Sequence, residues 1–150
     1  MARFLFLVGS VYGNSSSVAE ECSEWLRSRG HAAEVFNTAS LQDLASDPEA
    51  ILMVCTSTTG DGELPDNIYP LYQALREEFP LMPERRYAVI ALGDSSYERF
   101  ADAGKQMDEL LTELQARRIG EPLFVDACET ADPEGEALAW LKEWMAELEA

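Results

Sequence analysis

VGSVYGNSSSVAE, residues 8–20, joins an apolar run to a loop of small residues that opens into a helix. Backbone N–H groups at a helix N-terminus commonly hold a phosphate, and this loop presents them among several hydroxyls. It has no lysine, and Asn14 breaks the GxxxxGK[ST] pattern of nucleotide triphosphatases. Phosphoryl transfer needs a lysine and a metal, whereas a phosphate that is only held does not. The stretch favours a bound mononucleotide, although taken alone it also fits an ordinary serine-rich helix start.

The pattern on either side of this stretch alternates between strands and helices. Apolar runs predict five strands, at residues 4–8, 32–36, 50–55, 87–92 and 123–125. Apolar residues at helical spacing predict helices beginning near residues 16, 41, 67, 100 and 133. Strands that alternate with helices predict a parallel sheet covered on both faces. Residues 1–150 are therefore expected to form a single five-stranded α/β domain.

Composition narrows the partners and the compartment. The chain is 47% hydrophobic and 26% charged, and its formal net charge of −17 disfavours nucleic acid as a partner. No apolar run approaches the ~20 residues of a membrane span, so no membrane association is expected. Three cysteines without a CxxC spacing argue against a disulfide framework and favour buried free thiols in a reducing cytosol. A cytoplasmic protein is predicted.

Ligands of such sheets bind beyond the carboxyl ends of the strands, so the loops that follow strands are the candidate site. Glycine, serine and threonine crowd three of the four loops in question, which are residues 10–15, 56–67, 93–100 and 126–129. The loop after Phe36 is expected to lie away from them.

Three of these segments resemble the flavodoxin family: GSVYGNS, CTSTTGDGELPDN and ALGDSSYERFADAGKQMD. The third is the most specific, and the resemblance covers the whole chain. It implies a flavodoxin-like three-layer sandwich with strand order 2-1-3-4-5, helices on both faces, and FMN as the cofactor. The strand order comes from the resemblance alone.

The resemblance also implies which residues bind FMN. The phosphate would be held by Ser10, Val11, Tyr12, Gly13, Asn14 and Ser15. The edge of the isoalloxazine ring would meet Ser57, Thr58, Thr59, Gly60 and Asp61. Further ring contacts would come from Leu92, Gly93, Asp94, Ser95, Ser96 and Phe100, with Tyr97 stacked on the ring and Asp126 nearby. Thr59 or Leu64 would cover the opposite ring face.

The implied function is one-electron transfer from an NADPH-dependent flavin reductase to an acceptor enzyme. The acidic residues of the loops, Asp61, Glu63, Asp66, Asp94 and Glu98, form a face suited to a basic reductase of the flavodoxin/ferredoxin-NADP type. We interpret them as a docking rim and not as a metal site, and we predict a monomer with no catalytic residues of its own. The alternative is an FMN-dependent reductase that acts on a small substrate itself.

Overall fold

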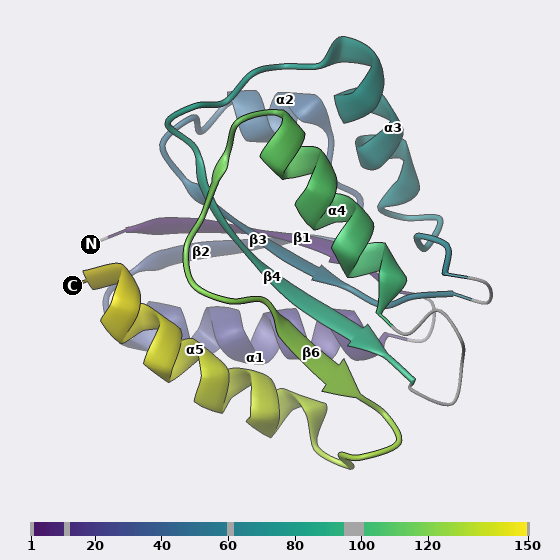
Figure 1. Ribbon diagram of the computed structural model, residues 1–150. Helices are drawn as coiled ribbons and strands as arrows, with labels where there is room; N and C mark the ends of the chain where they lie inside the picture. Colours follow the sequence, from purple (N-terminus) through teal and green to yellow (C-terminus); the bar gives the residue numbers. More distant parts are fainter. Residues whose placement is uncertain (1, 11–12, 60–61, 95–100, 150) are drawn as a thin grey trace.

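The computed structural model describes residues 2–10, 13–59, 62–94 and 101–149, which form a parallel sheet between two layers of helices (Figure 1). The strands are β1 (Arg3–Gly9), β2 (Ala32–Phe36), β3 (Ile51–Thr56), β4 (Arg86–Gly93), β5 (Arg117–Arg118) and β6 (Leu123–Asp126). They lie in the order β2-β1-β3-β4, and both β5 and β6 pair with β4. The five predicted strands therefore have the order 2-1-3-4-5 with β6 as the fifth, which confirms that prediction.

The sequence did not predict β5. Arg117 and Arg118 are exposed and carry no apolar pattern, so nothing in their residue types indicates a strand. Their backbone pairs with Arg86 and Tyr87 near the start of β4. Two backbone hydrogen bonds join this segment to β4 and the residue before it. The Arg117 N–H donates to Arg85 O, and the Ile119 N–H donates to Tyr87 O. β5 is recognisable as a strand only from its backbone pairing.

Within the part of the chain that the structure describes, five helices cover the sheet, as predicted. They are α1 (Asn14–Ser28), α2 (Leu41–Ala45), α3 (Tyr69–Glu78), α4 (Asp102–Glu113) and α5 (Pro133–Glu149). Figure 1 shows α1 and α5 on one face, with α2, α3 and α4 on the other. None of the helices in the described residues is long and apolar enough to cross a membrane.

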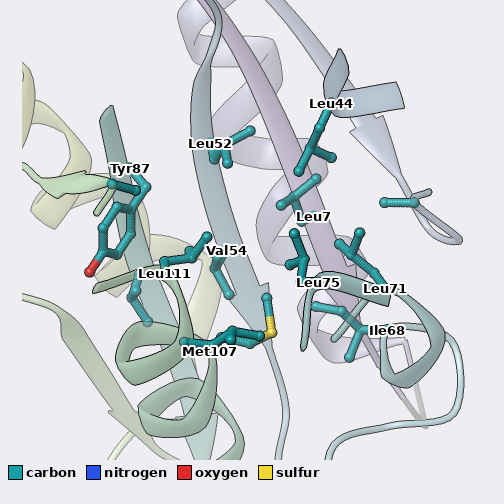
Figure 2. Packing of buried hydrophobic residues seen from close by; sticks show 14 of the residues in the cluster. Leu7, Leu44, Leu52, Val54, Ile68, Leu71, Leu75, Tyr87, Met107 and Leu111 are labelled. Atoms are coloured by element: carbon teal, nitrogen blue, oxygen red, sulfur yellow. The ribbon is translucent and has the colours of Figure 1, made fainter. Parts of the chain in front are cut away.

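The strands β1, β3 and β4 each supply alternate side chains to two separate cores. Leu7, Leu52 and Val54 point toward α2, α3 and α4 (Figure 2). Their neighbours Phe6 and Met53 point toward α1 and α5. Because both faces are covered, β1, β3 and β4 are buried along almost their whole length, which explains why they read as continuous apolar runs.

The sheet register brings the strand ends together at one edge. Gly9 at the end of β1 lies opposite Thr56 at the end of β3, and Gly93 at the end of β4 lies opposite Asp126 at the end of β6. The loops that follow these strands therefore start side by side, which is the arrangement that the candidate site requires.

A buried tyrosine closes the opposite end of β4. The Tyr87 hydroxyl donates to Asp108 Oδ1 at 2.6 Å and lies 2.9 Å from Thr112 Oγ1, both on α4. Asp108 Oδ2 in turn accepts from Arg118. Burial, together with the bond to Asp108, raises the pKa of Tyr87 to about 12.

This shift predicts how stability depends on alkaline pH. The unfolded phenol ionises first, near pH ~10, so the contribution of Tyr87 is complete below that pH and is lost as the pH rises toward the folded value of about 12. We expect the free energy of unfolding to fall by up to ~1.4 kcal/mol per pH unit in this window. Urea denaturation between pH 9 and 11.5 measures it, and Tyr87→Phe should remove most of the slope. An equally steep slope in Tyr87→Phe would assign the loss to other groups.

Candidate functional site

The N-terminus of α1 follows β1, and its first residues, Gly13 and Asn14, are exposed. Gly13 is its N-cap in the left-handed region, at φ 86, where glycine carries little strain. Because Gly13 has no side chain, it makes no side-chain hydrogen bond to the first N–H groups of the helix. The first turn contains no acidic residue. The Gly13 N–H donates to Ser10 Oγ at 2.8 Å, and Asn14 is exposed. The positive end of the α1 dipole, bordered by serine hydroxyls, suits a dianionic phosphate.

Ser15 joins this first loop to the second. Its side chain is fully buried, and its Oγ lies 2.6 Å from Ser57 Oγ just beyond β3. The Ser57 N–H donates to Gly9 O, and the Cys55 thiol donates to Ser15 O. The hydroxyl of Ser15 thus holds the two loops together, which its residue type alone did not indicate.

Two asparagines, Asn67 and Asn37, add further hydrogen bonds between the first and second loops and α1. Asn67, at the end of the second loop, accepts from the Ser10 N–H at 2.9 Å and donates to Val8 O and Asn37 O. Asn37 Oδ1 accepts from Ser16 Oγ at 2.7 Å. The expectation that the loop after Phe36 lies away from the site is therefore wrong at its first residue, because Asn37 is bonded both to α1 and to the second loop.

The second loop contains a tight turn. Thr59 and Glu63 pair as an isolated antiparallel bridge, and Gly62 within the turn has φ 92. Leu64, which follows, is buried in the core beneath α3 and α4. Of the two residues expected to cover the ring face opposite Tyr97, Thr59 is partly exposed and Leu64 is buried.

The same loop is held against α4 at two points. The Ala103 N–H in the first turn of α4 donates to Thr58 Oγ1, so Thr58 supplies a cap from another loop. Gln106 Nε2 donates to Gly62 O at 2.6 Å. The N-cap of α4, Ala101, has φ 55, a left-handed conformation that costs a residue with a side chain of order 1 kcal/mol or more. The start of α4 and the second loop are thus fixed to each other.

At the far side of the site, the ends of β4 and β6 meet in a polar contact. The Cys128 thiol donates to Asp94 Oδ1 at 2.8 Å, and the Cys128 N–H donates to Asp126 Oδ1. Within the described residues this trio has ligand atoms within 4.8 Å of one another, close enough to hold a metal ion. A thiol–carboxylate hydrogen bond accounts for the contact by itself.

The three cysteines are free thiols, but they are not alike. Cys22 and Cys55 are buried, and burial raises the pKa of Cys22 to about 12 and the pKa of Cys55 well above its ordinary value. Cys128 is exposed, so the expectation of three buried thiols is wrong for it.

The structure brings most of the predicted site to one edge of the sheet. Eleven residues lie in or directly beside the four loops: Ser10, Gly13, Asn14, Ser15, Ser57, Thr58, Thr59, Leu92, Gly93, Asp94 and Asp126. Eight others lie outside the described residues: Val11, Tyr12, Gly60, Asp61, Ser95, Ser96, Tyr97 and Phe100. Asn37, Asn67, Gln106 and Cys128 were not predicted, and the only signal for them is a polar residue close to a strand end or on the helix beside it.

Comparison with known proteins gives a consistent result. The family model for flavodoxin matches residues 7–140. Flavodoxin YqcA of Escherichia coli strain K12 is 46% identical over 144 residues, covering 96% of this chain and 97% of that one. Protein MioC of the same strain is 32% identical, with 97% of each chain covered. The solved structure of a cysteine-to-serine mutant of flavodoxin from Pseudomonas aeruginosa superimposes with a TM-score of 0.92 at 42% identity, covering 99% of both chains.

Proposed function

The chain belongs to the flavodoxin family, whose members bind FMN and carry electrons, and from this premise we propose that it shuttles low-potential electrons from an NADPH-dependent flavin reductase to an acceptor enzyme. The single observation that supports a held nucleotide most directly is the open N-terminus of α1. Gly13 leaves its first N–H groups without a side-chain cap, and Ser10 borders them. A terminal phosphate fits this place without any lysine.

The other loops supply what the rest of the cofactor needs. Ser57, Thr58 and Thr59 would meet one edge of the ring, and Gly93 with Asp94 another. From the family resemblance, Tyr97 would stack on the exposed ring face. When bound, FMN supplies a ring that accepts and releases electrons one at a time. The bonds from α4 to Thr58 and Gly62 support this role, because they hold the second loop in place.

The acidic residues around these loops would receive the reductase. Glu63 and Asp66 are exposed beside the second loop, and the whole chain carries a net charge of −17. Such a surface steers a basic partner, and the effect weakens as salt screens it. We place the protein in the cytoplasm as a monomer that meets donor and acceptor in turn.

Cofactor binding and electron flow are tested separately. Titration of the apoprotein with FMN, followed by quenching of flavin fluorescence, should saturate at one FMN per chain. The loaded protein should be reduced rapidly by NADPH only when a flavin reductase is added. Rapid reduction by NADPH alone, with turnover of a small acceptor, would instead favour the FMN-dependent reductase. A chain that takes up no FMN would refute both functions.

The docking surface has its own matched control. Glu63→Gln with Asp66→Asn should slow reduction by the reductase and flatten its dependence on salt. The same two-charge change on α5, Glu136→Gln with Glu143→Gln, should leave both nearly unchanged, since these exposed residues lie on a helix at the other face of the sheet. Equal effects of the two double variants would mean that net charge matters and the surface does not.

A further inference from the structure

Asn67 lies beside the end of β1, where β1 extends beyond its neighbouring strand β2. Even-numbered backbone groups of β1 face β2, as the bond from the Ala32 N–H to Ala2 O shows. β2 ends at Phe36, opposite Leu7, so the next two groups on that side, Val8 O and the Ser10 N–H, have no strand beside them. The Asn67 carboxamide bonds both, donating to Val8 O at 3.0 Å and accepting from the Ser10 N–H at 2.9 Å.

These are the two bonds that the N–H and the C=O of one residue of a further parallel strand would make around Gly9. The Asn67 Nδ2 also donates to Asn37 O at 2.7 Å, just past the end of β2. Because its nitrogen faces two carbonyls and its oxygen faces an N–H, only one orientation of the amide satisfies all three bonds. The Asn67 side chain thus makes the hydrogen bonds to β1 that β2 would make if it were longer.

The approach of Asn67 depends on the bare backbone at Gly9. A Cβ built on Gly9 would lie 2.6 Å from Ile68 Cγ2 and 2.2 Å from Thr56 Oγ1. Since Ile68 adjoins Asn67 and is buried, the segment that carries Asn67 can lie this close to β1 only because Gly9 has no side chain.

We propose that Asn67 is a positioning residue for the phosphate of FMN, acting through Ser10 and the start of the phosphate loop without touching the cofactor. The inference rests on the proposed function, since it concerns the cofactor which that function uses. Ser10 Oγ accepts from the Gly13 N–H, so fixing the backbone of Ser10 also fixes the left-handed cap that opens α1. The effect should fall on the phosphate group and spare the ring.

The test compares FMN with riboflavin, which lacks the phosphate, in the same protein. Asn67→Ala should weaken FMN binding by about tenfold or more while changing riboflavin affinity by less than about threefold. Asn67→Asp keeps the acceptor for the Ser10 N–H but cannot donate to the two carbonyls. Its affinity for FMN should therefore also fall more than its affinity for riboflavin. Equal losses for FMN and riboflavin in either folded variant would overturn the proposal.

Gln106→Ala is the matched control, because it removes a carboxamide that bonds the same loop at Gly62, away from the phosphate. It should alter the two affinities by a similar factor. Amide hydrogen exchange in the apoprotein needs no FMN: the Ser10 N–H should be protected in the parent protein and exchange faster in Asn67→Ala. An unprotected Ser10 amide in the parent would overturn the inference at its structural premise. Protection without any FMN binding would instead refute the proposed function, and with it the role toward the phosphate, while the bond from Ser10 to Asn67 would stand.

Discussion

Gly104→Ala should lower the free energy of unfolding by about 2–3 kcal/mol, although alanine is the better helix former. Gly104 lies on α4 against β4, and a Cβ at this position would be 2.3 Å from Ala91 Cβ and 3.2 Å from Ala91 Cα. The second atom belongs to the backbone of a central strand, so side-chain rotation cannot relieve the contact. α4 would have to move away from the sheet, and with it the helix start that holds the second loop.

A second substitution distinguishes this contact from other effects. Ala91→Gly removes the atom that the new Cβ would meet, so the double variant should be more stable than Gly104→Ala alone. Urea denaturation of the four proteins in the cycle measures the coupling. If Gly104→Ala stabilises the protein, helix propensity outweighs the contact and the close approach is not rigid.

Arg85→Ala should cost about 3 kcal/mol of stability. Arg85 precedes β4 and is only 5% exposed, and its guanidinium donates to Leu44 O and Asp47 O just where α2 ends. Burial lowers the pKa of this guanidinium, so the protein already gives up solvation to place a cation here. Truncation would leave two carbonyls without their donor, and each bond from a charged group contributes ~1.5–3 kcal/mol.

The neighbouring Arg86 provides the control, because it is exposed and the same residue type. Arg86→Ala should change stability by less than ~0.5 kcal/mol. Chemical denaturation of the two variants should therefore separate them clearly. Similar small effects in both would show that the carbonyls at the end of α2 find water when Arg85 is removed.

The sequence predicted the layers of the fold because a strand that is buried on both faces consists almost wholly of apolar residues. β1, β3 and β4 are buried almost throughout, and a run such as Phe4–Val8 cannot be read in another way once helices flank it. β5 has no such apolar run, since its pairing uses only backbone groups of two exposed arginines.

The site was predictable to a different degree. Strand ends located the loops, and the family resemblance assigned roles within them. The bonds that shape the loops could not be predicted, because they join side chains to backbone far away in sequence. Asn67 contacts residues 30 to 59 positions away, and Ser15 meets Ser57 across 42. Nothing in the local pattern around an asparagine or serine says which distant carbonyl it will meet.

The central position of β1 has a consequence for the order in which a growing chain can fold. The loop after β1 is synthesised early, yet its partners Ser57 and Asn67 follow by more than forty residues. The chain must therefore emerge from the ribosome as far as Asn67, just before α3, before this pocket can take shape. Until α3 and α4 follow, the face of β1 that carries Leu5 and Leu7 lacks most of its cover. Cofactor capture during translation can begin only after that point.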